Sequence, residues 1–252
     1  MPRAALVTGG AQRIGAALVT ALSQDGWAVA IHYRTAGNAA QALAAEIVQR
    51  GGRAVALEAD LAIEAETASL LKRASAALGP IGCLVNNASI FENDTALEAT
   101  RESWDAHMAT NLRAPFVLMQ NFARALPDSV EGCIVNLLDE RVWSLTPYFV
   151  SYTVTKAALW TLTQTMALAL APRIRVNGIG PGPTLPSPRQ TDTQFARQCR
   201  AMPLGHGTTP EEIAAALRFI LAAPAMTGQM IALDGGQHLG WAQPPVPPVC
   251  EE

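Results

Sequence analysis

Short apolar runs alternate with longer helix-like segments along almost the whole chain. The apolar runs are uninterrupted, which is typical of strands buried on both faces of a sheet. The expected strands are Ala4–Thr8, Ala28–His32, Ala54–Ala59, Cys83–Asn86, Cys133–Leu138, Arg175–Ile179 and Met230–Leu233. The expected helices are Ile14–Gln24, Asn38–Arg50, Glu64–Leu78, Trp104–Ala125, Tyr152–Ala171 and Glu211–Ala222.

This alternation predicts a doubly wound α/β domain, with a parallel sheet of about seven strands and helices on both faces. No internal repeat or linker divides the chain, so we expect a single domain over residues 1–252. Two segments interrupt the rhythm. Residues 185–207 belong to a stretch rich in Pro, Thr and Gly, and we expect them to form a substrate lid. Residues 242–252 are Pro-rich and are expected either to fray as a terminus or to contact another subunit.

The composition argues against several classes of function. Only 15% of the residues are charged, the net charge is −3, and no stretch is rich in Lys or Arg. We therefore expect no nucleic-acid partner and no basic membrane-binding face. No apolar run reaches about 18 residues, so no membrane span is expected. The first residues lead directly into a strand without a signal-peptide pattern. The four cysteines (Cys83, Cys133, Cys199 and Cys250) lack metal-ligand spacing, so we expect a cytoplasmic protein without a bound metal.

A glycine-rich loop joins the first expected strand to the first expected helix, with the sequence Thr8-Gly9-Gly10-Ala11-Gln12-Arg13-Ile14-Gly15. Glycines there let the backbone approach a pyrophosphate, and the helix N-terminus supplies unpaired N–H groups. The loop resembles the T-G-x-x-x-G-x-G loop of the short-chain dehydrogenase/reductase family. Arg13 stands at the middle glycine, as in a variant of this loop in pteridine reductases. The resemblance implies a Rossmann-type fold whose dinucleotide contacts Gly9, Arg13, Ile14 and Gly15.

The end of the second expected strand indicates which dinucleotide binds. An NAD-dependent enzyme places an acidic residue there to hold the adenosine ribose. No Asp or Glu occurs between Gly26 and Gln41. Arg34, with help from His32 and Thr35, offers hydrogen-bond donors for a 2′-phosphate instead. We therefore expect NADP(H) to be the cofactor.

The resemblance extends from about Ala4 to Gly240 and implies further contacts with the cofactor. The family has an Asp near the adenine ring after the third strand. Its N-N-A-G motif corresponds here to N-N-A-S, with serine in place of glycine as in pteridine reductases. Its P-G-x-x motif flanks the nicotinamide carboxamide. These motifs contribute Asp60, Leu61, Asn87, Ala88, Ser89, Pro181, Gly182 and Thr184.

Tyr152 and Lys156 form the expected proton-donating pair. A spacing of four residues places both side chains on one face of a helix. A nearby ammonium and the positively charged oxidised nicotinamide favour the phenolate and are expected to lower the pKa of the phenol. Tyr152 then delivers the proton that accompanies hydride transfer. The resemblance implies that Lys156 also holds the nicotinamide ribose. It further implies that Asn111 steadies a water-linked proton relay to Lys156.

One catalytic position departs from the family pattern. The family has a serine before its tyrosine, but the corresponding residue, 13 positions before Tyr152, is Asp139. A carboxylate repels a developing alkoxide, whereas it is a good acceptor for the N–H groups of an aminopyrimidine. Pteridine reductases carry Asp at this position and an aromatic residue that covers the pterin, which Phe91 matches. Phe91, Asp139 and Tyr152 are therefore the expected substrate-binding residues.

The substrate expected from these features is a small planar molecule, most simply a dihydropterin or dihydrofolate. An alternative within the family is reduction of a carbonyl group such as that of a 3-oxoacyl thioester. An alternative of another class is a catalytically silent protein that kept the dinucleotide fold for regulation. The resemblance implies a homotetramer.

Overall fold

All seven predicted strands are present in the computed structural model, which describes residues 1–240, and all neighbouring strands in the single sheet are parallel. Their order is β3-β2-β1-β4-β5-β6-β7, the doubly wound arrangement expected from the alternating pattern. The strands are β1 (Ala4–Val7), β2 (Ala28–Tyr33), β3 (Ala54–Glu58), β4 (Cys83–Asn86), β5 (Gly132–Leu137), β6 (Ile174–Pro181) and β7 (Met230–Leu233).

Burial on both faces explains why these strands lack apolar–polar alternation. A row formed by Leu6, Leu84 and Ile134 faces one helical layer, and the neighbouring row of Val7, Val85 and Val135 faces the other. Every residue of β1, β4 and β5 is buried. The buried polar residues of β4 and β5, Asn86 and Asn136, are hydrogen bonded to each other at 2.8 Å, which offsets their loss of water.

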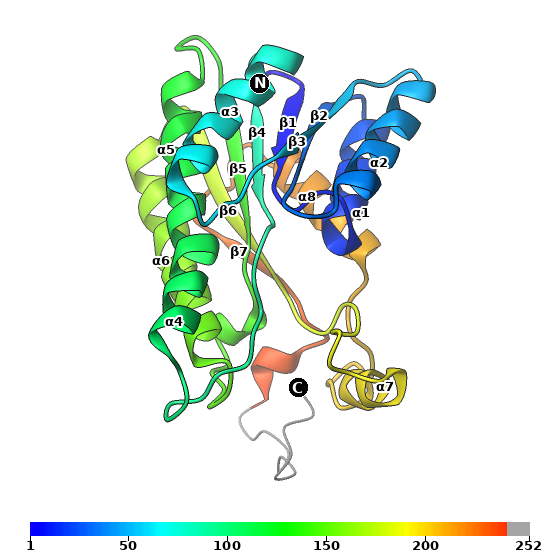
Figure 1. Cartoon of the computed structure of the whole chain (residues 1–252), viewed down its shortest axis with the longest axis vertical. Coiled ribbons are helices and arrows are strands. Elements are labelled where there is room, and N and C mark those ends of the chain that lie inside the picture. The colour runs from blue at the N-terminus through cyan, green and yellow to red at the C-terminus, as the bar shows by residue number, and fades with distance from the viewer. Residues whose placement is uncertain (241–252) are drawn as a thin grey trace.

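The helices form a layer on each face of the sheet, as Figure 1 shows. One face is covered by α1 (Arg13–Gln24), α2 (Gly37–Gln49) and α8 (Pro210–Ala222). The other face is covered by α3 (Glu64–Leu78), α5 (Ala114–Ala125) and α6 (Val150–Leu170). Thr209 caps α8 by accepting a hydrogen bond from the Glu212 N–H, so the predicted start of this helix is confirmed. In residues 1–240 there is no helix both long and apolar enough to cross a bilayer.

Cys83 and Cys133 lie side by side in β4 and β5 and are completely buried free thiols. Burial raises the pKa of both thiols, that of Cys133 to about 11. They are therefore packing residues that stay protonated at neutral pH. Cys199 is also a free thiol, and Cys250 lies outside the described residues.

The helix predicted over Trp104–Ala125 is longer and less regular than expected. It begins at Arg101 as α4 (Arg101–His107), passes through a π-helical segment η1 (Met108–Arg113), and continues as α5. A π-helical turn adds a residue to the hydrogen-bonded ring and is frequent at functional sites. The η1 segment contains Asn111, one of the predicted catalytic residues.

The predicted lid, residues 185–207, contains a helix that sequence patterns had not indicated. This helix, α7 (Asp192–Arg200), stands apart from both helical layers in Figure 1. Thr191 and Gln194 form a reciprocal capping box at its N-terminus, a signal that was present in the sequence. The short helices η2 (Glu140–Val142) and η3 (Gln237–Leu239) follow β5 and β7. The Pro-rich tail, residues 242–252, lies outside the described residues.

Candidate active site

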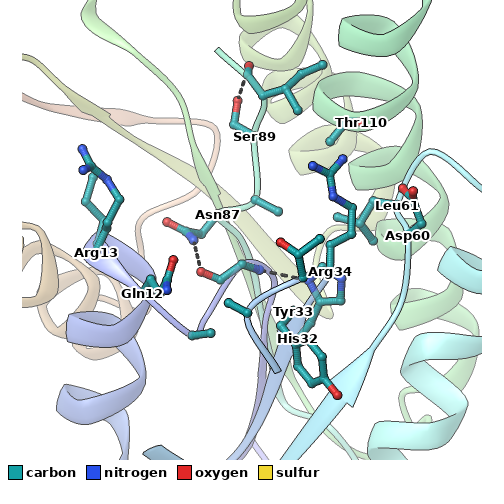
Figure 2. A pocket seen from close by; sticks show the side chains of 18 residues that line it. Gln12, Arg13, His32, Tyr33, Arg34, Asp60, Leu61, Asn87, Ser89 and Thr110 are labelled. Carbon is teal, nitrogen blue, oxygen red and sulfur yellow. Dashed lines mark hydrogen bonds between the residues drawn. The ribbon is translucent and has the colours of Figure 1, made fainter. Parts of the chain in front are cut away.

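The strand order reverses between β1 and β4, and a cavity of about 400 Å³ opens beside their carboxyl ends. Figure 2 shows this first cavity with Arg13 and Arg34 on opposite sides of it. It is lined by twelve of the residues that the sequence assigned to the cofactor: Gly9, Arg13, Ile14, Gly15, His32, Arg34, Thr35, Asp60, Leu61, Asn87, Ala88 and Ser89. Gln12, Tyr33 and Thr110 also line it, without having been predicted.

The glycine loop closes tightly over the start of α1. A Cβ atom on Gly15 would lie 2.0 Å from the carbonyl oxygen of Gly9, which only glycine avoids. Gly9 itself has a φ of 59°, in the left-handed region. Arg13 also takes a left-handed φ of 53°, which is strained for a residue with a side chain. This conformation explains why a glycine suits the middle position of the family's loop.

Thr8 and Asn87 tie the glycine loop to the segment that follows β4. The Thr8 Oγ1 atom accepts hydrogen bonds from the N–H groups of Asn87 and Ala88, at 2.9 and 3.0 Å. The Asn87 amide in turn donates to the carbonyl oxygen of Thr8 at 2.8 Å. It also donates to the carbonyl oxygen of Gly9 at 3.0 Å, the bond drawn in Figure 2. The two loops therefore form one rigid wall of the first cavity.

His32 has a role that the sequence did not predict. Its Nδ1 accepts a hydrogen bond from the Gly9 N–H at 3.0 Å, and its Nε2 lies 3.0 Å from the Ala59 carbonyl oxygen. Burial lowers the pKa of His32, so the ring is neutral. With both nitrogens bonded to the backbone, the ring supports the glycine loop. Its assistance to Arg34 at a 2′-phosphate stays a prediction, and His32 lines the first cavity.

A second cavity, of about 280 Å³, adjoins the first one. The two cavities share four lining residues, Arg13, Ile14, Asn87 and Ser89. The second cavity brings together the remaining predicted site residues except Asn111, namely Phe91, Asp139, Tyr152, Lys156, Pro181, Gly182 and Thr184. The lid contributes Leu185, Ser187, Gln190, Phe195 and Gln198.

Tyr152 and Asp139 are directly hydrogen bonded in the second cavity. The Tyr152 hydroxyl donates to Oδ2 of Asp139 at 2.8 Å. Oδ1 of Asp139 accepts from the N–H of Arg141 at 2.9 Å, and the Arg141 guanidinium lies 3.3 Å from Oδ2. Burial and the Asp139 carboxylate raise the pKa of Tyr152 well above its ordinary value. The expectation of a lowered phenol pKa is therefore wrong for this structure, in which Tyr152 stays protonated.

Lys156 is buried behind this pair. Its Nζ donates to the Leu137 carbonyl oxygen at 2.8 Å and lies 5.5 Å from the centre of the Tyr152 ring. Burial lowers the pKa of Lys156 from 10.5 to about 8, although Asp139 acts in the opposite direction. The loss of hydration around the ammonium thus outweighs its attraction to the nearby carboxylate.

Asn111 lines neither cavity but holds the segment after β4 in place. Its Oδ1 accepts from the Ile90 N–H at 2.9 Å, and its Nδ2 donates to the Ile90 carbonyl oxygen at 3.0 Å. The same Nδ2 lies 3.3 Å from Oγ1 of Thr155, the neighbour of Lys156. Asn111 therefore connects the π-helical segment to α6.

Phe91 belongs to an aromatic cluster beneath the reacting pair. It stacks on Phe149 with ring centres 4.3 Å apart, and it meets the Tyr152 ring edge-on at 4.7 Å. Phe149 precedes α6 with a left-handed φ of 55°. The guanidinium groups of Arg141 and Arg189 each lie 5.3 Å from the Phe91 ring centre. Because Phe149 covers one face of the Phe91 ring, a planar ligand can stack only on the other face.

The lid is held to both walls of the second cavity by arginines. Arg189 donates to the Phe91 carbonyl oxygen at 2.7 Å and pairs with Glu92 at 2.9 Å. On the opposite wall, Arg13 donates to the Leu185 carbonyl oxygen at 3.3 Å. No local sequence pattern indicates this role of Arg189, because its partners lie nearly one hundred positions away.

Asp94 was not predicted and caps the helix that carries Tyr152. Its Oδ1 accepts from the Ser151 N–H at 3.0 Å, and its Oδ2 accepts from the Ser103 hydroxyl at 2.9 Å. Burial by itself would raise the pKa of Asp94, but hydrogen bonds from Ser151 and Ser103 outweigh it and hold the pKa below its usual value. The residue that caps a helix normally lies just before it in the sequence. Asp94 lies far from Ser151 in the sequence, so no local motif indicates this cap.

The site therefore combines a long cavity suited to a dinucleotide with a smaller one that holds a protonated phenol, a carboxylate and an ammonium. This arrangement can place a planar acceptor against a ring bound at the junction and give it a proton. Within residues 1–240 no group of three or more His, Cys, Asp or Glu side chains is arranged to hold a metal ion.

Comparison with known proteins identifies the family of this chain. The family profile described as Enoyl-(Acyl carrier protein) reductase matches residues 9–238. The 3-oxoacyl-[acyl-carrier-protein] reductase of Synechocystis sp. is 32% identical over 92% of this chain and 95% of that protein. The chain belongs to the short-chain dehydrogenase/reductase family of oxidoreductases.

Two solved structures are more similar in sequence. FolM alternative dihydrofolate reductase 1 from Brucella canis, complexed with NADP, is 46% identical with a TM-score of 0.91, covering 96% of each chain. The Brucella suis protein of the same description, also in complex with NADP, is 47% identical with a TM-score of 0.92. That match covers 95% of this chain and 96% of that one.

Removing the Asp94 carboxylate should loosen the N-terminus of α6. We expect Asp94→Ala to lower the free energy of unfolding by about 1–3 kcal/mol, because the buried Ser151 N–H loses its acceptor. Asp94→Asn keeps an acceptor oxygen and should restore most of the lost stability. Urea unfolding of both variants measures the difference, and equal destabilisation by Asn and Ala would contradict a capping role.

Lys156 should make stability depend on pH above neutrality. Between pH about 8 and 10.5 the folded chain has released the Lys156 proton while the unfolded chain still binds it. The unfolded state then holds more protons, so the free energy of unfolding contributed by Lys156 rises with pH, by up to about 1.4 kcal/mol per pH unit. Urea unfolding of wild type and Lys156→Met from pH 7.5 to 10 isolates this contribution. If the free energy of unfolding varies with pH in the same way for both proteins, burial does not shift the pKa of Lys156.

Proposed function

We propose that this protein is an NADPH-dependent reductase of a dihydropterin or dihydrofolate, with Tyr152 as the proton donor. The observation that carries the proposal is the hydrogen bond from the Tyr152 hydroxyl to Asp139, inside a cavity that adjoins the dinucleotide cavity. A ketone reductase of this family is expected to have a serine at the Asp139 position. A carboxylate there suits a substrate with N–H donors.

The first cavity fits NADP(H) by its shape and charge. Gly9 and Gly15 lie close together, and this leaves room for a pyrophosphate beside the start of α1. The first N–H groups of a helix have no partner within the helix and can bind the phosphates. Arg34 and Thr35 line the end of the cavity beyond β2 and would contact a 2′-phosphate. The NADP complexes of the two Brucella proteins support this assignment.

The residues of the second cavity account for the proton transfer. When bound, NADPH supplies the hydride. Tyr152 is held protonated by burial and by Asp139, which is the form that a proton donor requires. Lys156 would hold the nicotinamide ribose. Pro181, Gly182 and Thr184 would border the nicotinamide at the junction of the cavities.

Phe91 supports a planar substrate. Its ring lines the second cavity, and Phe149 fixes the ring plane by stacking on it. A pterin lying against this ring would have Asp139 and Tyr152 at its reacting edge. The dihydrofolate reductase descriptions of the Brucella structures favour this substrate class, whereas the Synechocystis relative favours a 3-oxoacyl thioester.

We also propose a cytoplasmic homotetramer, in which subunit contacts would cover exposed apolar residues such as Leu168 and Phe219.

Replacing Arg34 should change the cofactor preference. Wild type is expected to use NADPH with a much higher kcat/KM than NADH. Arg34→Asp should lower kcat/KM for NADPH by roughly 10- to 100-fold, because a charged hydrogen bond to the 2′-phosphate is worth about 1.5–3 kcal/mol. Arg50→Asp, an equal charge change at an exposed residue directly after α2, serves as the control. Equal use of NADH and NADPH by wild type would refute the assignment.

Replacing Asp139 should separate the two candidate substrates. With NADPH oxidation as the readout, wild type is expected to reduce dihydrobiopterin, dihydromonapterin or dihydrofolate faster than an acetoacetyl thioester. Asp139→Ser restores the family's hydroxyl and should lower pterin turnover by at least about 10-fold while sparing or improving thioester turnover. Rapid thioester reduction by wild type, with every pterin inert, would make the thioester reductase the correct function.

A further inference from the structure

Gln237 has a side-chain amide in the wall of the second cavity, and the proposed mechanism does not use it. The residue begins η3, directly beyond the carboxyl end of β7. Its side chain lines the same cavity as Phe91, Asp139 and Tyr152. The amide therefore borders the space in which the substrate is proposed to bind.

The backbone of Gln237 is held firmly by its neighbours. Its N–H donates to the Asp234 carbonyl oxygen at 3.1 Å. The buried Asp234 carboxylate accepts from the N–H groups of Gly236 and His238, at 3.0 and 2.9 Å, and its Oδ2 lies 2.6 Å from Nδ1 of His238. These contacts fix the turn without the Gln237 side chain, so the amide is not required to build it.

The amide oxygen of Gln237 is buried and has no hydrogen-bond partner among the described residues. It lies beside Gly182, where an added Cβ would be 3.1 Å from Oε1. A buried acceptor without a partner costs about 1–3 kcal/mol. Such a group calls for a partner outside the described residues, such as an ordered water, an ion or a ligand. Because Gln237 lines the second cavity, a ligand bound there can supply that partner.

Asp139 cannot satisfy every donor of an aminopyrimidine by itself. Its Oδ1 accepts from the Arg141 N–H, and its Oδ2 accepts from the Tyr152 hydroxyl. A pterin carries several N–H donors next to ring acceptors. A primary amide offers one acceptor and two donors, so it matches an N–H next to an acceptor along one edge of a ring. The two ends of the amide can exchange places by rotation about the last side-chain bond, so either one can face the cavity.

We infer that Gln237 is a specificity-determining residue, whose carboxamide pairs with an adjacent N–H donor and acceptor on the edge of the heterocyclic substrate. This inference rests on the proposed pterin or folate reductase function. The Gln237 carboxamide selects for heterocycles with a lactam or amidine edge. It selects against simple ketones and thioesters, which carry an acceptor only. A substrate without N–H donors leaves the buried oxygen of Gln237 unpaired.

Gln237→Met tests this role, because methionine has a similar length and no hydrogen-bonding amide. With dihydrobiopterin as the probe, we expect kcat/KM to fall roughly 10- to 100-fold, while the Kd of NADPH, measured by fluorescence titration, changes less than about twofold. Binding of a 2,4-diaminopteridine, measured by the same method, should weaken in parallel. Gln229→Met is the matched control, since Gln229 is exposed at the opposite end of β7 and lines neither cavity.

The outcomes separate this inference from the function on which it rests. If wild type reduces dihydrobiopterin and Gln237→Met does so equally well, the inference is wrong and the pterin reductase stands. If the Kd of NADPH rises as much as pterin turnover falls, the amide serves the nicotinamide and the inference is again wrong. If wild type reduces no pterin, the proposed function fails and the inference fails with it.

Discussion

The parallel pairing of the central strands is the constraint on which the rest of the site depends. Because β1, β4, β5 and β6 all run in the same direction, the loops after them gather at one edge of the sheet. Thr8 and Asn87 bond the first two of these loops to each other. Both cavities are built from these loops, which is why they share Arg13 and Ser89 and form one continuous site.

Burial sets the charge states at the reacting end of this site. The phenol of Tyr152 and the ammonium of Lys156 are both removed from water, which raises the pKa of the first and lowers that of the second. Asp139 reinforces the protonated phenol by accepting its hydrogen bond, and Arg141 balances the carboxylate. The result is a protonated phenol beside a carboxylate in the second cavity.

The segment after β4 connects the sheet to α6, the helix that carries Tyr152, and fixes the position of that helix. Asn111 holds Ile90, Phe91 stacks on Phe149, and Asp94 caps α6. Two residues of the site, Arg13 and Phe149, have strained backbones, since both adopt left-handed conformations. Strain of this kind persists only where the surrounding contacts fix the chain, as the hydrogen bonds and ring contacts do here.

The sequence by itself determined the strands, most helix boundaries and the parallel sheet, and every site residue that it predicted except Asn111 lines one of the two cavities. These features follow from local patterns: uninterrupted apolar runs, a glycine loop at a strand end, and Tyr152 four positions before Lys156. Only the tertiary structure decided the role of His32, the direction of the Tyr152 pKa shift, and the contributions of Asp94, Arg189 and Gln237. Each of these depends on partners or burial brought about by distant segments, and no local pattern records which atoms those segments bring together.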